Sequence, residues 1–129
     1  MGFLTAQQIL EVNDMPEAQV VNVPEWGGDV LVRPMTAGER DLYEQDIMAS
    51  QAEGIVPNVR ARLVSYVAVD EQGNRLFSAE DIEALSKKNA TAIDRVFSKA
   101  RSMNVISKAD IEELEKNLES DHNDNSSSS

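Results

Sequence analysis

The 129-residue chain contains no cysteine and a single histidine, His122. Without cysteine it cannot form disulfides, thiolate zinc sites or thiol nucleophiles. One histidine near the end of the chain cannot build a histidine-centred triad or a multi-histidine metal site within one molecule. We therefore expect no catalytic residue, no metal and no cofactor.

Basic residues are scarce, with 12 Lys and Arg against 23 Asp and Glu, which gives a net charge of −11. This balance argues against binding nucleic acid by phosphate neutralisation and against binding anionic membranes. Purely apolar runs are only a few residues long, and residues 1–8 lack the basic and apolar regions of a secretion signal. We expect a soluble cytoplasmic protein without nucleic-acid or membrane partners.

The abundant carboxylates do not indicate an active site. Asp41, Glu44 and Asp46 lie on one predicted helix, away from its apolar residues. General acid–base catalysis needs a carboxylate in a desolvating pocket. These side chains are typical of a solvated helix face, so we expect a protein that is not an enzyme.

Helix-capping patterns place most of the predicted helices. Thr5 and Thr36 each precede a Gln or Glu by three residues, the spacing of a capping box. They predict helices over residues 5–13 and 36–51, and residues 58–69 form the next, with 67–69 able to become extended. Ser78, Asn89 and Ser107 are the predicted caps of three further helices.

Residues 18–33 have the pattern of a β-hairpin. Two runs rich in valine flank the turn-forming segment 24–29, which contains two glycines. Such a hairpin is marginal alone in water and must pack on helices.

Apolar spacing predicts which helix faces are buried. The cleanest pattern follows Asn89, and other stripes occur after Thr36 and after Ser107. The three sets are Ile93, Val96, Phe97, Ala100 and Met103; Leu42, Tyr43, Ile47 and Met48; and Ile111, Leu114 and Leu118.

These patterns predict a mainly α-helical fold with an N-terminal β-hairpin; an α+β fold is the alternative. Residues 1–118 are expected to form one helical domain. Residues 119–129 are acidic and serine-rich without an apolar side chain. They cannot offset the entropy of ordering, so we expect a disordered tail.

Two apolar residues are candidates for partner binding. Trp26, the only tryptophan, lies in the hairpin loop, where it could pack on the core or anchor a partner. Met48 lies at the edge of its helix stripe, and methionine surfaces adapt to varied partners.

Three sequence segments carry a resemblance to a known family. They are V-P-E-W-G at 23–27, V-R-P-x-T-x-x-E-R-D at 32–41, and D-E-Q-G-N-R-L-F at 70–77. Together with the helix order that follows, they resemble the tail assembly chaperones of long-tailed siphophages over residues 18–118. The motifs are structural rather than catalytic.

The resemblance implies a short, pre-frameshift form of such a chaperone. Members of the family bind the long, helical tape measure protein and help the tail tube polymerise around it. A frameshift-extended form would add contact with the major tail tube protein, and self-association is possible. The resemblance further implies action in the host cell cytoplasm and absence from the mature virion.

The sequence is also consistent with two other functions. One is a virion structural or tail-completion component, which would be present in purified virions. The other is an acidic nucleic-acid mimic that inhibits a DNA-binding enzyme, whose binding would be sensitive to salt.

Overall fold

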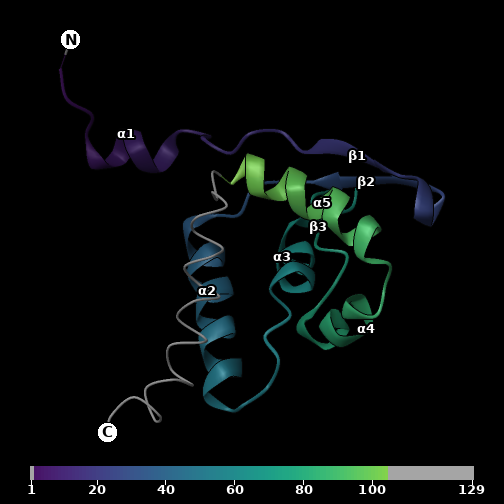
Figure 1. Ribbon diagram of the computed structural model, residues 1–129. Coiled ribbons are helices and arrows are strands. Elements are labelled where there is room, and N and C mark those ends of the chain that lie inside the picture. The colour runs from purple at the N-terminus through teal and green to yellow at the C-terminus, as the bar shows by residue number, and fades with distance from the viewer. Residues whose placement is uncertain (1, 105–129) are drawn as a thin grey trace, which may run out of the picture.

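The computed structural model describes residues 2–104 of the chain (Figure 1). Helices dominate it, and a small antiparallel sheet of strand order β1-β2-β3 completes the fold. The helices are α1 (Ala6–Glu11), α2 (Ala37–Ala52), α3 (Val59–Val67), α4 (Ile82–Ser86) and α5 (Ala90–Met103). The strands are β1 (Gln19–Val23), β2 (Gly28–Val32) and β3 (Ala68–Val69). The fold is mainly α-helical, as predicted.

The predicted hairpin is present as β1 and β2. Val20 pairs with Leu31, and Val23 pairs with Gly28. A 3-10 turn at Pro24–Trp26 joins the strands, and Gly27 follows it with φ of 74°. This left-handed conformation is one that glycine adopts without steric cost, so the glycine expected in the loop has a defined structural function there.

The end of α3 becomes extended, as the sequence allowed. Residues 68–69 form β3, which pairs with β2 through Leu31–Val69 and Val32–Ala68. The third strand ties α3 directly to the hairpin.

α2 begins with the predicted capping box. Thr36 accepts from the backbone N–H of Glu39, and the Glu39 carboxylate accepts from the backbone N–H of Thr36. Arg33, just after β2, also donates two hydrogen bonds of 2.8 Å to Glu39. The Arg33 guanidinium, aided by the Thr36 amide, lowers the pKa of Glu39 to about 2. One carboxylate therefore connects the sheet to the start of α2.

We expect acid to weaken the fold through Glu39. Its pKa is lowered on folding, so its contribution is complete above about pH 4.5 and is lost as pH falls towards 2. With allowance for solvent screening, this contribution is about 2 kcal/mol. Urea unfolding at pH 6 and pH 2.5 should show that Glu39→Gln removes this part of the acid sensitivity. Glu83→Gln, in an exposed pair with Lys87, should not, and equal effects of both substitutions would contradict the assignment.

The core lies where α5 meets the sheet and α3. α5 contacts β1, β2 and α3 (Figure 1). Its predicted stripe is confirmed, with Met103 only partly buried. The remaining stripe residues are buried together with most of α3: Ile93, Val96, Phe97 and Ala100 with Leu63, Val64 and Val67.

The prediction that the four apolar residues of α2 form one buried face is wrong. Tyr43 and Ile47 are buried, but Leu42 and Met48 are exposed. At 100° per residue these two pairs point to opposite sides of the helix, so only one of them can face the core.

The predicted helix with Ile111, Leu114 and Leu118 lies outside the described residues, as does the acidic tail at 119–129. The first predicted helix is present as α1, with its Thr5 capping box. None of its residues is buried.

Candidate partner-binding surface

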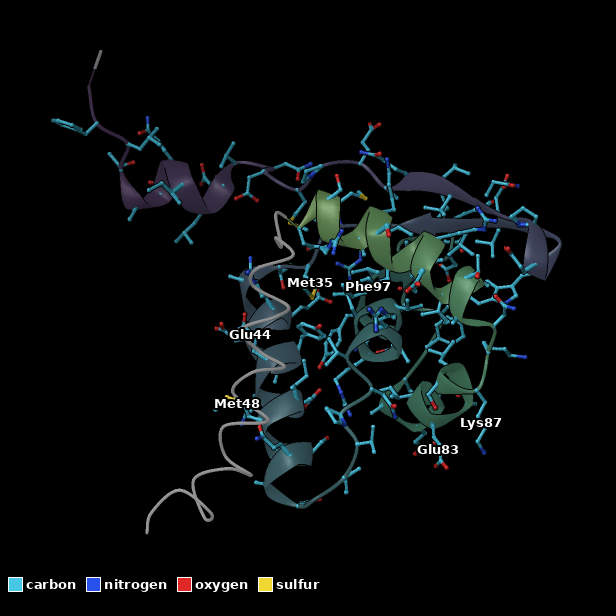
Figure 2. The ribbon with its side chains drawn as sticks, in the orientation of Figure 1. Met35, Glu44, Met48, Glu83, Lys87 and Phe97 are labelled. Atoms are coloured by element: carbon cyan, nitrogen blue, oxygen red, sulfur yellow. The ribbon has the colours of Figure 1, made fainter. Side chains whose placement is uncertain are left out.

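One side of α2 presents apolar side chains to solvent. Leu42 is 52% exposed and Met48 is 65% exposed, and the small residues Ala49 and Ala52 are exposed on the same side. The exposed polar residues Asp41 and Gln45 also lie on this side, with Gln45 between Leu42 and Met48. Figure 2 shows Met48 pointing away from α3 and α5. We call Leu42, Met48, Ala49 and Ala52 the α2 outer face.

A polar network between α2 and α3 holds this face in place. The Tyr66 hydroxyl donates a 2.7 Å hydrogen bond to the Asp46 carboxylate. Arg62 donates to the Ser50 hydroxyl at 3.2 Å and to the Pro57 carbonyl at 3.0 Å. Neither Asp46 nor Ser50 belongs to the outer face, so these bonds join α2 to α3 without using the residues of that face.

The chemistry of Tyr66 suits a structural function. Burial and the hydrogen bond to Asp46 raise the pKa of Tyr66 to about 12. The phenol is therefore a neutral hydrogen-bond donor at physiological pH. Its ring also packs edge-on against Tyr43, with centroids 6.1 Å apart, and beneath the Arg75 guanidinium at 4.2 Å. The Tyr43 contact stabilises the α2–α3 pairing, and the Arg75 contact ties α3 to the segment after β3.

Trp26 has a different setting from Met48. It is partly buried and packs against the core. Its neighbour Glu25 accepts hydrogen bonds of 2.8 to 3.2 Å from Arg95 on α5, which anchors the hairpin turn. The Arg95 guanidinium lowers the pKa of Glu25.

The turn that carries Trp26 lies at the opposite end of the molecule from α2 (Figure 1). The structure therefore places the two candidate residues on separate surfaces. Leu42 extends the exposed surface around Met48. Helical spacing assigned Leu42 and Met48 to the same stripe as Tyr43 and Ile47, and it could not show which of these pairs would be exposed.

The described part of the chain contains neither a metal-binding cluster nor a helix that could span a membrane. Within residues 2–104 no group of three or more His, Cys, Asp or Glu side chains could hold a metal ion. None of the helices there combines the length and apolar character required to cross a membrane.

Comparisons with known proteins identify the family. A family model described as phage tail assembly chaperone matches residues 6–117, most of the chain. The structure of the bacteriophage HK97 tail assembly chaperone is similar, with a TM-score of 0.56 and 16% sequence identity over 79% of this chain and 95% of that chain. At this identity the likeness supports the fold alone. No curated protein matches the sequence significantly. Given the extent of the family match, the chain belongs to the phage tail assembly chaperone family.

Proposed function

We propose that this protein is a non-enzymatic chaperone that binds the tape measure protein and assists polymerisation of the tail tube around it. The observation that carries the proposal is the α2 outer face, an apolar surface left exposed on a member of this family. The site of action is the host cytoplasm.

The physical problem is the protection of a long helical partner. Before the tube surrounds it, the apolar stripes of a tape measure protein face water and promote aggregation. A helix can pack on the α2 outer face because Leu42 and Met48 offer apolar contacts and the small Ala49 and Ala52, which follow Met48, permit close approach there. The unbranched Met48 side chain adapts to different contacts along the partner.

The charge of the chain supports the same function. A net charge of −11 keeps a complex soluble while its apolar surfaces are buried. Binding through apolar area rather than ion pairs would survive moderate salt.

Co-expression tests the proposal. The cognate tape measure protein should move from the pellet to the soluble fraction when this chain is present, and the two should co-purify in moderate salt. The fraction of tape measure protein in the supernatant is the measurement. If it stays insoluble beside the folded chain, the chaperone function is wrong.

The proposal also covers the fate of the protein in the virus. The chaperone should be missing from purified virions by mass spectrometry, whereas a structural or tail-completion component would be present. A frameshift-extended form would bring the major tail tube protein to the complex. Its detection in infected cells as a longer product containing this sequence tests that part.

A further inference from the structure

The last described residue, Asn104, is held at the start of α2. Its side-chain oxygen accepts a hydrogen bond from the backbone N–H of Met35, and its carbonyl accepts a hydrogen bond of 3.4 Å from Arg40. Figure 1 shows the end of α5 close to the start of α2. Residues 105–129 therefore continue from a point that is fixed against α2.

A row of side chains on α2 leads away from this point. Arg40, Glu44, Met48 and Ala52 are spaced four residues apart, so they form one ridge along the helix, which we call the α2 ridge. Figure 2 shows Glu44 and Met48 on the same side of α2, away from α3. Among the described elements α2 packs mainly on α3, so residues 2–104 leave this ridge open.

The two ends of the α2 ridge differ in polarity. Arg40 and Glu44 pair with each other at 3.4 Å, which balances the charge at the end near Asn104. Met48 and Ala52 form the apolar end, and both are exposed. An apolar segment that leaves Asn104 along this ridge would therefore meet its favourable contacts in the second half of α2.

The sequence after Asn104 contains such a segment. Ser107 predicts the start of a helix, and Ile111, Leu114 and Leu118 form its apolar stripe. A lone helix of this length is marginal in water, so its stripe needs a surface on which to pack. The family model matches residues 6–117, so the family pattern continues through this segment.

The segment and the ridge also match in length. Met48 lies about 12 Å along the helix axis from the start of the ridge, and Leu114 would lie about 10 Å from the start of the predicted helix. Leu114 and Leu118 are four residues apart, as are Met48 and Ala52. A helix that starts level with the ridge therefore brings the two pairs together.

Charge makes such a contact weak. α2 has four carboxylates and one arginine, and residues 107–118 have four carboxylates and two lysines. Both are net negative, so apolar packing has to hold the contact against repulsion. A weak contact of this kind can be displaced by a partner that binds the same side chains.

We infer that residues 107–118 pack along the α2 ridge of their own molecule, and that the tape measure protein displaces them. Met48 and Ala52 belong both to the ridge and to the α2 outer face, so segment and partner compete for them. The free protein alternates between a covered form and an open form in which Met48 is exposed. The covered form shields the apolar face from wrong partners. The choice of partner rests on the proposed function, whereas the contact within one molecule is tested without it.

Disulfide formation tests the contact in the full chain, because the natural chain has no cysteine to interfere. In a glutathione buffer, Met48→Cys with Leu114→Cys should form an intramolecular disulfide about tenfold faster than the control, since docking raises the effective concentration of the two thiols. The matched control is Leu42→Cys with Leu114→Cys, because Leu42 is 52% exposed on α2 but lies outside the ridge. Equal rates for the two pairs would overturn the contact. So would equally fast linking between separate chains that each carry one cysteine of the Met48–Leu114 pair.

Binding to a soluble tape measure segment tests the competition. Leu114→Asp should bind this segment about fivefold more tightly than the wild type, because the competing contact is lost. Ala109→Asp adds the same charge on the opposite side of the predicted helix and should leave the affinity unchanged. The tape measure segment should also slow the Met48–Leu114 disulfide. Unchanged affinity of Leu114→Asp, or an unchanged disulfide rate, would overturn the competition.

The inference and the proposed function can fail separately. If the tape measure protein becomes soluble on co-expression but the two cysteine pairs react equally fast, the ridge is not covered and the chaperone function stands. If the Met48–Leu114 pair reacts faster while the tape measure protein stays insoluble, the contact within the molecule stands. The competition is then wrong together with the proposed function.

Discussion

Replacing Phe97 with alanine is expected to lower the free energy of unfolding by about 3–5 kcal/mol. The side chain is 4% exposed and lies between α5 and α3 (Figure 2). The guanidinium groups of Arg60 and Arg101 lie 5.5 and 5.7 Å from its ring centroid. Truncation would leave a cavity in the core and remove both cation–π contacts.

Urea unfolding followed by circular dichroism provides the measurement for Phe97→Ala. Phe3→Ala is the matched control, because the same atoms are removed from a side chain that is fully exposed. The control should change stability by about 0.5 kcal/mol or less. Both chains should be measured at low concentration, so that contacts between copies do not contribute. A near-neutral Phe97→Ala would mean that this stripe of α5 is not part of a tightly packed core.

Local signals explain why much of the fold could be predicted. The capping boxes at Thr5 and Thr36 satisfy backbone N–H groups within one turn, so they act without help from distant residues. The stripe on α5 is equally clear because its opposite face is polar, which leaves only one side to bury. The glycines at 27–28 indicated the hairpin turn for the same local reason.

Tertiary contacts determine which side of α2 is buried and whether α1 joins the core, and the sequence alone predicted neither. α2 has apolar residues on two sides, so periodicity alone did not distinguish the side of Tyr43 from that of Met48. The choice depends on the bonds from α2 to α3, including Tyr66 to Asp46 across 20 positions of the chain. The undocked state of α1 is likewise a matter of distant packing, since the local sequence predicts only that a helix forms.

The exposure of the two candidate residues could not be predicted from their residue type. Trp26 and Met48 were both chosen as large apolar residues near the edge of a structural element. Trp26 proved to pack partly against the core, in a turn that the Glu25–Arg95 pair joins to α5. Met48 proved to be exposed beside Leu42, which makes α2 the surface to test.

A double substitution of the α2 outer face, Leu42→Asp with Met48→Asp, is expected to weaken binding to the tape measure protein by about 100-fold or more. Loss of each buried apolar side chain costs about tenfold or more, and the new carboxylates would be desolvated in the complex. Affinity for a soluble tape measure segment, measured by calorimetry, gives the result. Urea unfolding should be little changed, because both side chains are exposed in the free protein.

Leu76→Asp is the control for this surface. Leu76 is 49% exposed, close to the 52% of Leu42, but it lies in the segment after β3 rather than on α2. If added negative charge weakened binding in a general way, Leu76→Asp and the double variant would both bind more weakly. If the partner contacts α2, only the double variant should lose affinity. If the double variant binds as tightly as the wild type while the wild type solubilises its partner, the chaperone function stands and the binding surface must lie elsewhere. The partly exposed Trp26 would then be the next residue to substitute, since its turn is at the other end of the molecule.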